Sequence, residues 1–242
     1  MSITLCFDFG NTRKKVAVFE EAELAGVTVL TDDATETIQT LINTYQPRKS
    51  ILSSVVDHNP GIEELLAVKT KFHKLNHLTK LAFTTPVGKP QTIGADRLAL
   101  VAAAVHYYPQ KHNLVIGMGS CVTYNFVNKY HEFLGGAISP GMEMRLKAMN
   151  QFTAKLPLVK ADSNVPLIGY DTDSNILSGV VLGMAKEIDG FIDAYKERFG
   201  NFNVLLTGGD LVHLASHLKN KIFADSDLIF KGLYAISEVN NP

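Results

Sequence analysis

Residues 5–18 read LCFDFGNTRKKVAV, and residues 114–127 read LVIGMGSCVTYNFV. In each stretch a short apolar run leads to a glycine and a small polar residue, and a β-rich run follows. Apolar runs that end at such turns are typical of buried strands. Gly10 and Gly119 occupy the same point of the pattern, 109 positions apart in a chain of 242 residues. The spacing indicates two structural repeats, each opening with a strand, a glycine turn and a strand, although one short match can also arise by chance.

The rest of the chain alternates between strand and helix patterns. Strands are expected at Ile3–Phe9, Lys15–Glu20, Ser50–Val56, Leu81–Thr84, Asn113–Gly117, Val122–Val127, His131–Ile138 and Val204–Thr207. Helices are expected at Thr35–Tyr45 (with Asp32 or Asp33 as N-cap), Gly61–Lys71, Asp96–Tyr107, Gly141–Phe152, Asp173–Phe199 and Leu211–Leu218. Pro86–Gly94 is expected to be a loop and the C-terminal tail irregular. This mixed order predicts a layered α/β fold.

Composition bounds the class of protein. The chain is 46% apolar and 19% charged, and 23 basic against 24 acidic residues leave a formal net charge of −1. This balance gives no general attraction to nucleic acids or anionic membranes. Cys6 and Cys121 stand in apolar surroundings and are expected to be free thiols. The first residues lack the features of a signal peptide, and the longest apolar run, Leu98–Val105, is too short to span a membrane, so we expect a soluble cytoplasmic protein.

Glycine turns at strand ends let backbone N–H groups approach an anion. Four such turns occur, at Gly10-Asn11-Thr12, Gly119-Ser120, Gly135-Gly136 and Gly208-Gly209. Asp8, just before the first turn, could hold a magnesium ion through water. Together the turns could cradle a nucleotide; each alone is more simply an ordinary hairpin turn. The chain contains neither a P-loop nor a GxGxxG segment after a strand, which disfavours Walker-type kinases and simple Rossmann dehydrogenases.

Two further segments stand where loops enter helices. Asp96, in Gly94-Ala95-Asp96-Arg97, is either a helix cap or a general base at the mouth of a cleft, with Arg97 as an anion-binding group. The segment Gly135–Gly141 (GGAISPG) either admits a ligand close to the backbone or makes a sharp connection.

These segments occur in one order: DFGNT at Asp8–Thr12, GADR at Gly94–Arg97, GGAISPG at Gly135–Gly141 and TGG at Thr207–Gly209. Their order and spacing resemble the type III pantothenate kinases of the actin-like superfamily, over nearly the whole chain. The DxGNT and GxDR segments carry most of the resemblance. It implies an α/β fold with two ribonuclease-H-like (actin-like ATPase) repeats, 1–110 and 111–242, which flank a central nucleotide cleft. It also implies a homodimer.

The resemblance implies transfer of a phosphoryl group from ATP to pantothenate, the first step of coenzyme A biosynthesis, with magnesium near Asp8. Asp96 would be the general base on the pantothenate hydroxyl. The implied ATP-binding residues are Asp8, Phe9, Gly10, Asn11, Thr12, Arg13, Lys14, Lys15 and Ser120. The implied pantothenate-binding residues are Phe83, Gly94, Ala95, Asp96, Arg97 and, across a dimer interface, Thr172.

The chain departs from the family pattern at three positions. Where the family has an aspartate that binds a monovalent cation (potassium or ammonium), this chain has Gly117, which has no carboxylate. Ser120 replaces the usual threonine and keeps its hydroxyl. Phe83 replaces a substrate-contacting tyrosine, and loss of that hydrogen bond would cost on the order of 1 kcal/mol.

The leading hypothesis is therefore an active pantothenate kinase. Gly117 leaves open a nucleotide-binding paralogue without activity and with a regulatory role. A kinase of this superfamily that acts on a sugar or a carboxylate is disfavoured by the GADR segment and the short chain. The expected partners are pantothenate, ATP and a second copy of the chain, with no nucleic acid and no membrane.

Overall fold

The computed structural model describes residues 2–85 and 88–241, and the chain divides into two compact units. The first unit takes in the chain up to Gln110, the segment Tyr130–Leu134 and the chain from Asp227 onward. The second unit comprises Lys111–Lys129 and Gly135–Ser226. Two residues of the expected loop Pro86–Gly94, Pro86 and Val87, lie outside the described residues.

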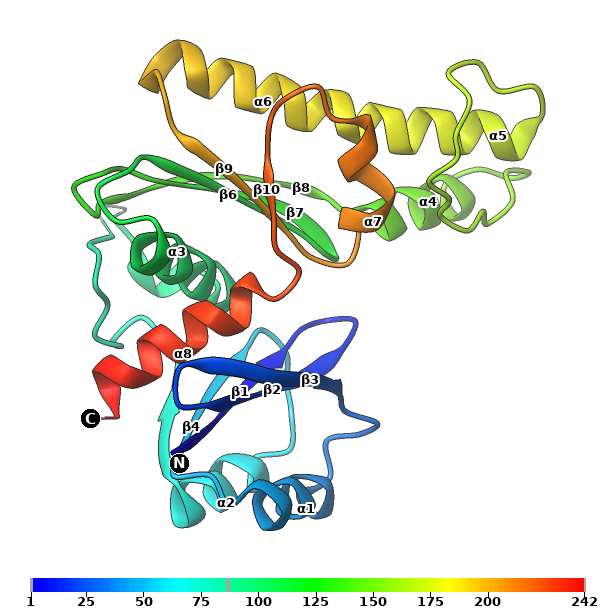
Figure 1. Ribbon diagram of the computed structural model, residues 1–242. Helices are drawn as coiled ribbons and strands as arrows, with labels where there is room; N and C mark the ends of the chain where they lie inside the picture. The colour runs from blue at the N-terminus through cyan, green and yellow to red at the C-terminus, as the bar shows by residue number, and fades with distance from the viewer. Residues whose placement is uncertain (1, 86–87, 242) are drawn as a thin grey trace. The chain divides into compact units, whose positions relative to one another are not determined.

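The first unit contains the strands β1 Ile3–Phe9, β2 Lys14–Glu20, β3 Glu23–Val29, β4 Lys49–Ser54 and β5 Lys71–Lys74. They form one sheet in the order β3-β2-β1-β4-β5 (Figure 1). The β1–β2 pair is antiparallel and the β1–β4 pair parallel, so the predicted N-terminal hairpin is confirmed. The sequence analysis missed β3 and β5. Strand β3 is mostly exposed, so it lacks the apolar pattern that marks a buried strand.

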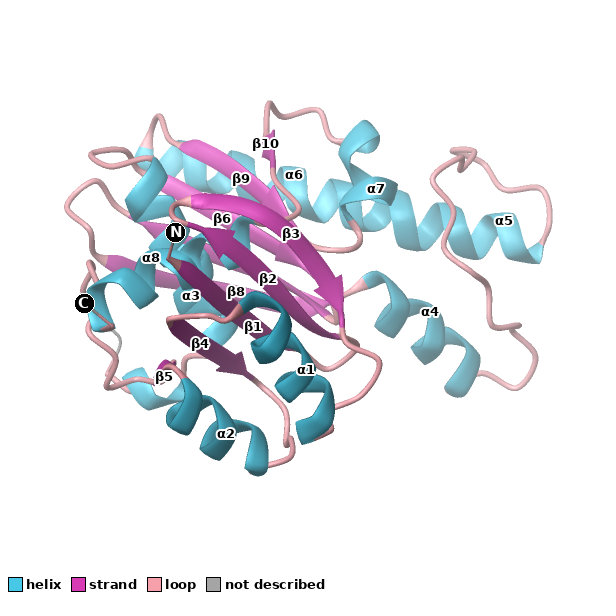
Figure 2. Cartoon of the chain, turned by 60° about the horizontal axis from the view of Figure 1, so that its bottom comes forward, coloured by secondary structure: helices cyan, strands magenta, loops and turns pink. Residues whose placement is uncertain are grey.

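Helices cover both faces of this sheet (Figure 2). The helices are α1 Thr35–Tyr45, α2 Gly61–Lys69, α3 Ala95–Tyr107 and α8 Leu228–Asn240, with a short turn of 3₁₀ helix, η1, at Pro90–Thr92. Leu5, Phe7 and Phe9 of β1 point to the face that packs against α1 and α2. Helix α8 packs against β1 and β4 on the other face, and α3 packs against α8. Successive residues of β1 therefore alternate between two buried faces.

The C-terminal helix α8 contradicts the expectation of an irregular tail. Its Gly232 lies so close to α3 that a Cβ there would clash with the carbonyl oxygen of Ala99. Tyr234 stacks on Phe19 of β2, with 4.6 Å between ring centroids. Glycine lowers helix propensity in isolation. The helix is therefore stabilised by contacts with segments far away in the sequence, which local patterns do not reveal.

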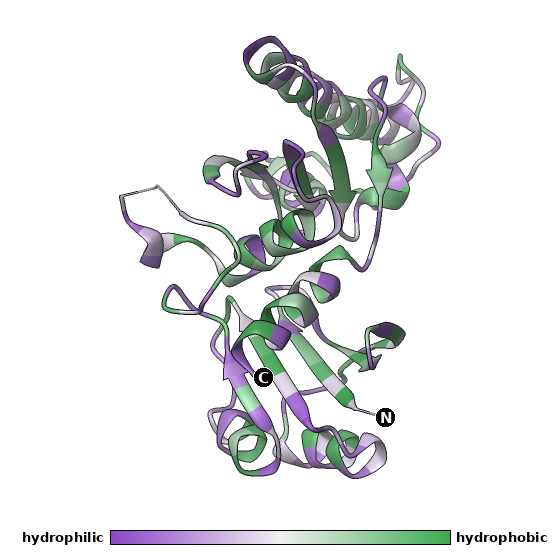
Figure 3. Cartoon of the chain, turned by 60° about the vertical axis from the view of Figure 1, so that its left-hand side comes forward, coloured by the Kyte–Doolittle hydropathy of each residue, from purple (hydrophilic) through white to green (hydrophobic). Residues whose placement is uncertain are grey.

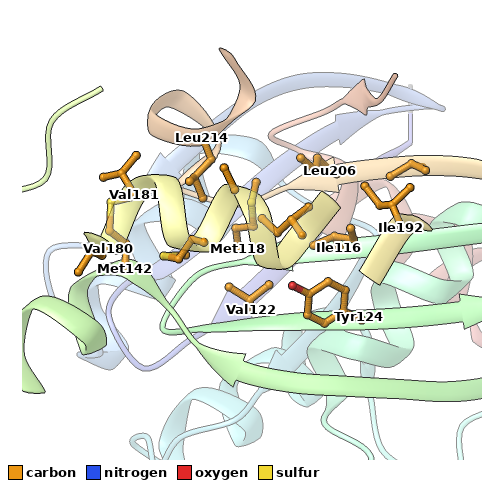
Figure 4. Close-up of a cluster of buried hydrophobic side chains, with 14 of the residues drawn as sticks. Ile116, Met118, Val122, Tyr124, Met142, Val180, Val181, Ile192, Leu206 and Leu214 are labelled. Carbon is orange, nitrogen blue, oxygen red and sulfur yellow. The ribbon is translucent and has the colours of Figure 1, made fainter. Parts of the chain in front are cut away.

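The second sheet contains the strands β6 Asn113–Met118, β7 Cys121–Val127, β8 Phe133–Pro140, β9 Asn203–Thr207 and β10 Phe223–Ala224, and all of it except the first two residues of β8 belongs to the second unit. The helical segments of this unit are α4 Met142–Gln151, α5 Thr172–Leu177, the π-helical turn η2 Ser178–Leu182, α6 Gly183–Phe199, α7 Leu211–Leu214 and the 3₁₀ turn η3 Ala215–His217. The predicted long helix Asp173–Phe199 is thus helical throughout, with a π-helical turn in its interior. Figure 4 shows the apolar core between the strands and the helices, where Ile116, Tyr124 and Ile192 are buried.

The two sheets have the same strand order. The second sheet runs β8-β7-β6-β9-β10, with β6–β7 antiparallel and β6–β9 and β9–β10 parallel, as in the first sheet. Strand β6 corresponds to β1, so the match of Gly119 with Gly10 is structurally meaningful. The α/β fold with two actin-like repeats is confirmed. The repeat bounds 1–110 and 111–242 stay a prediction.

The second hairpin is one residue shorter than the first. Phe9 pairs with Lys14 across the first turn, whereas Met118 pairs with Val122 across the second. The sequence match therefore holds along the first strand of each hairpin and shifts by one position in the second strand.

Most helices have mixed hydropathy, with purple and green residues on the same helix in Figure 3. Such mixing is typical of helices with one face on a core and the other in water. Within residues 2–85 and 88–241, no helix combines the length and apolar character that crossing a membrane requires.

Two local expectations are wrong. Neither Asp32 nor Asp33 is the N-cap of α1, which is Ala34; Asp32 instead accepts hydrogen bonds from the backbone of Ala34 and the hydroxyl of Thr37. Of the expected strand Leu81–Thr84, Thr84 alone forms an isolated bridge, with Glu132.

Candidate active site

Asp8 lies near the end of β1, between two neighbouring strands. Its cross-strand partner in β2 is Lys15, and its partner in β4 is Ser53. Burial and the nearby carboxyl group of Asp96 raise the pKa of Asp8 to about 7, and Lys15 acts in the opposite direction. A carboxyl group with such a perturbed pKa beside a second carboxyl group is typical of functional sites.

Asp96 is the second residue of α3, directly after the turn that contains Gly94. Burial raises its pKa, and the backbone N–H and the guanidinium group of Arg97 act in the opposite direction. A Cβ on residue 94 would clash with a carboxylate oxygen of Asp96. Gly94 therefore leaves room for the side chain of Asp96. The N-cap of α3 is Gly94 itself, with no side-chain hydrogen bond, so Asp96 is not the N-cap of this helix.

The carboxyl groups of Asp8 and Asp96 suit a magnesium ion that is bound together with the phosphates of a nucleotide. Among the described residues, no group of three or more His, Cys, Asp and Glu side chains could hold a metal ion unaided. Magnesium usually binds one or two carboxylates and keeps water or phosphate oxygens as its other ligands. The positive charge would also relieve the repulsion between the two carboxyl groups.

The first hairpin turn presents Asn11, Thr12 and Arg13 to solvent, and the N–H of Gly10 donates to the carbonyl of Arg13 at 3.1 Å. The ring of Phe9 is fully buried among core residues, which leaves only its backbone for a ligand.

The two lysines after the turn have different surroundings. Lys14 Nζ lies 2.5 Å from Asp33 Oδ2 and 5.7 Å from the centroid of Phe9. Lys15 follows it in the strand, so its side chain points to the opposite face, which it shares with Asp8. Lys15 is therefore the lysine on the side of the two carboxyl groups.

Two further residues of the expected pantothenate pocket, Arg97 and Phe83, contact Phe133, which the sequence analysis did not single out. The guanidinium group of Arg97 lies 5.7 Å from the centroid of Phe133. Phe83 packs its ring edge to face against the same side chain, with centroids 6.4 Å apart. Ala95 and Phe83 are buried. Phe133 lies within the expected strand His131–Ile138, so nothing in the sequence marked it as a site residue.

Ser120 lies in the turn of the second hairpin, and neighbouring backbone supports that turn from two sides. The N–H of Gly141 donates to the carbonyl of Ser120 at 3.0 Å. A Cβ at Gly141 would clash with the carbonyl oxygen of Gly119, and a Cβ at Gly208 (φ +110°) with that of Met118. Close backbone packing explains why both positions are glycine. For Gly141 this favours the interpretation of Gly135–Gly141 as a sharp connection between strand and helix over its interpretation as a ligand-binding segment.

Asp210 adds to this support. Its Oδ2 accepts a hydrogen bond from the backbone N–H of Met142, at the start of α4, at 3.2 Å. Burial raises the pKa of Asp210, and this hydrogen bond acts in the opposite direction.

A network of polar side chains fixes the end of β8. Arg145 donates to Ser139 Oγ at 2.9 Å and to the carbonyl of Pro140 at 2.8 Å. Glu187 of α6 forms an ion pair with Arg145, with 2.5 Å between Oε2 and Nη2. Its Oε1 accepts a hydrogen bond from the hydroxyl of the buried Tyr124 at 3.0 Å. These residues come from separate elements, and no sequence motif joins them.

Gly117 lies between two threonines in the sheet. Its partners in register are Thr123 of β7 and Thr207 of β9, and both are buried. Residues in register on neighbouring strands point to the same face. The position therefore offers hydroxyl groups and lacks the carboxylate that the family pattern puts there.

Thr172 is the exposed first residue of α5. The preceding residue, Asp171, caps the helix, with its Oδ1 accepting from the N–H of Ser174 at 2.8 Å. Leu167, Ile168 and Tyr170 are 79%, 83% and 85% exposed, so three exposed large hydrophobic side chains precede Thr172 in the sequence.

Sequence comparisons point to one family. A family profile described as type III pantothenate kinase matches residues 4–194. A protein of Christiangramia forsetii with that name is 42% identical over 240 residues, which cover 98% of this chain and 99% of the relative. A protein of Bacteroides fragilis with the same name is 39% identical, with 99% of each chain covered.

Solved structures agree at the level of the fold. A structure titled as a putative Baf family transcriptional activator, from Campylobacter jejuni, aligns with a TM-score of 0.63 at 22% identity and covers 98% of both chains. A glucokinase from an Antarctic psychrotroph aligns with a TM-score of 0.52 at 11% identity and covers 99% of both chains.

Proposed function

The chain belongs to the type III pantothenate kinase family, and we propose on this basis that Asp96 is the general base of its reaction. The chain is an ATP-dependent kinase that phosphorylates pantothenate to 4′-phosphopantothenate in coenzyme A biosynthesis. In this reaction the hydroxyl oxygen of pantothenate attacks the γ-phosphorus of ATP, the bond to the leaving oxygen of ADP breaks, and the hydroxyl proton goes to the base.

The observation that carries the assignment is the half-buried pair of carboxyl groups of Asp8 and Asp96, in which Asp96 helps to raise the pKa of Asp8. Burial raises the pKa of Asp96, which makes its carboxylate a better proton acceptor. The backbone N–H and the guanidinium group of Arg97 oppose that rise in the pKa, because both stabilise the ionised carboxylate. Gly94 makes room for the Asp96 side chain, which supports a defined orientation.

The β1–β2 hairpin and Ser120 are proposed to bind the phosphates of ATP. Phosphoryl transfer needs positioning and charge neutralisation more than covalent catalysis. The exposed turn Asn11–Arg13 offers backbone N–H groups, and Lys15 offers a positive charge on the face of Asp8. Ser120 offers a hydroxyl in a turn whose backbone packs closely against Gly141 and Gly208.

Membership of a kinase family implies a divalent metal ion beside ATP. We propose that Asp8 holds magnesium through a water molecule, with Asp96 as the second carboxylate nearby. When bound, magnesium supplies positive charge that neutralises the transferred phosphoryl group. A potassium or ammonium ion is not proposed at Gly117, because the position has no carboxylate.

Pantothenate is proposed to contact Phe83, Gly94, Ala95 and Arg97. Arg97 and Phe83 both pack on Phe133, which supports a rigid pocket wall with a cation for the pantothenate carboxylate.

We further propose a homodimer in which Thr172 reaches pantothenate bound to the partner. The exposed apolar residues Leu167, Ile168 and Tyr170 beside Thr172 support an interface at this segment. A cytoplasmic location follows from the proposed activity, since its substrate ATP is abundant there.

The test is release of ADP by the purified chain with ATP and Mg²⁺, with and without pantothenate. We expect pantothenate-dependent turnover that falls by about 100-fold or more in Asp96→Asn, while ATP affinity is kept. Asp162→Asn, a change at an exposed aspartate of the second unit, is the matched control and should retain full activity.

Two results would contradict the proposal. Turnover that persists in Asp96→Asn would remove Asp96 from the role of base. A wild-type chain that binds ATP but shows no pantothenate-dependent release would favour the nucleotide-binding regulator, which the full-length relatives do not favour.

A further inference from the structure

Ser53 is a buried serine of β4 whose hydroxyl group has no hydrogen-bond partner in the part of the chain that the structure describes. The residue is 0% exposed. A buried hydroxyl without a partner destabilises a fold, and most buried polar groups are therefore hydrogen-bonded. An unsatisfied buried hydroxyl in a native protein needs an explanation, and one explanation is that the group takes part in a functional site.

The sheet places Ser53 beside Asp8. The two residues are partners in the parallel β1–β4 pair, so their side chains leave the sheet on the same face from strands about 4.8 Å apart. Side chains in register on neighbouring strands have Cβ atoms about 5 Å apart, which lets a serine hydroxyl reach an aspartate carboxylate when the side chains take suitable rotamers. Ser50, on the other face of the same strand, is bonded instead to Thr70 Oγ1 at 2.6 Å.

Asp8 therefore has a potential donor on each side. Lys15 is its partner on β2 and Ser53 its partner on β4. A carboxylate has two oxygens, each with more than one acceptor site. One donor on each side would fix the rotation of the carboxylate and leave its outer acceptor sites for water on a metal ion.

We propose that Ser53 is a positioning residue for Asp8, whose hydroxyl donates a hydrogen bond to the carboxylate when Asp8 holds the water of a bound magnesium ion. The inference rests on the role proposed above for Asp8. It adds a residue that no motif of the sequence indicates, and it explains why a serine is tolerated at a fully buried position without a partner.

The test is calorimetric titration of ADP into the full chain, once with Mg²⁺ and once with EDTA, for the wild type and Ser53→Ala. We expect the variant to lose about tenfold in affinity for ADP with Mg²⁺, as for a hydrogen bond to a charged group, and to match the wild type in EDTA. The melting temperature in EDTA should not fall, because the removed hydroxyl has no partner in the absence of the metal.

Ser50→Ala is the matched control, because it removes a buried hydroxyl from the same strand that does have a partner. It should lower the melting temperature and leave the effect of Mg²⁺ on ADP affinity unchanged. Ser53→Ala that keeps the full effect of Mg²⁺, or that loses as much stability in EDTA as Ser50→Ala, would overturn the proposal.

The experiment separates this inference from the proposed function, because it uses no pantothenate and measures no turnover. Asp8→Asn is the reference for complete loss of the Mg²⁺ effect. If Asp8→Asn keeps that effect, the role of Asp8 fails and the inference about Ser53 fails with it. If Asp8→Asn loses the effect and Ser53→Ala does not, only the inference fails.

Discussion

Asp8 and Lys15 face each other across the β1–β2 hairpin, whereas the neighbouring Lys14 extends from the opposite face of β2 to Asp33. Two adjacent lysines of one motif thus have separate surroundings. Lys15 shares the face of the proposed phosphate and magnesium site. The ion pair of Lys14 with Asp33 links the hairpin to the loop before α1.

Replacing Lys15 by Met should weaken ATP binding by about tenfold or more, because a charge-assisted contact to phosphate is lost. Lys14→Met should change ATP affinity little, and the loss of its partly exposed ion pair with Asp33 should change the stability little, because solvent screens such pairs. Calorimetric titration with ATP and urea unfolding measure the two effects. Equal loss of ATP affinity in both variants would contradict the assignment.

Asp8 should make the ligand-free protein less stable as pH rises toward 7. Its folded pKa is raised to about 7, above the ordinary value of 3.8, so between these limits the folded state binds more protons than the unfolded state. Stability then falls with rising pH in this window. Asp8→Asn removes the effect, and its melting temperature should exceed that of the wild type by about 5 °C at pH 8 and by little near pH 4.

Melting curves of both proteins at several pH values give the difference directly. Using the difference cancels the contributions of other groups, such as Glu63, whose pKa is lowered. A difference that does not change with pH would show that Asp8 titrates in the folded state as it does in the unfolded chain.

The kinase should turn over at equal rates in potassium and sodium buffers. Gly117 has no carboxylate to hold a monovalent cation, and its neighbours in register are the uncharged Thr123 and Thr207. Release of ADP with pantothenate, measured at matched ionic strength, tests this expectation. A rate in sodium several times lower than in potassium would mean that other oxygen atoms bind the ion.

Gly232→Ala should destabilise the chain by about 2 kcal/mol or more, since a Cβ would clash with the carbonyl oxygen of Ala99. Gly190→Ala in α6 is the matched control. Gly190 is exposed, and apart from its chain neighbours and the nearby backbone of its own helix no described residue has an atom within 4 Å of a Cβ built there, so alanine should stabilise the helix by up to about 1 kcal/mol. Urea unfolding measures both, and a neutral Gly232→Ala would contradict the tight contact between α3 and α8.

Local patterns were sufficient for the elements that carry the proposed chemistry. The apolar run that ends at Gly10, the run that ends at Gly119 and the strongly helical segment after Gly94 all form as predicted, because each buries its own apolar residues in a regular period. Strand β3 and helix α8 were missed for opposite reasons. Strand β3 buries too little to show a pattern, and α8 depends on contacts with α3 and the sheet.

The sequence by itself determined the repeated strand–turn–strand units, the order of the motifs and the family, because these depend on residue types at short spacings. Only the tertiary structure decided which side chains share a face. Strand pairing puts Ser53 and Lys15 beside Asp8 and sets Thr123 and Thr207 on either side of Gly117. Side-chain packing brings both Arg97 and Phe83 against Phe133. The physical reason is that register and packing join residues distant in sequence, and the free energy of those contacts has no signature in any local pattern.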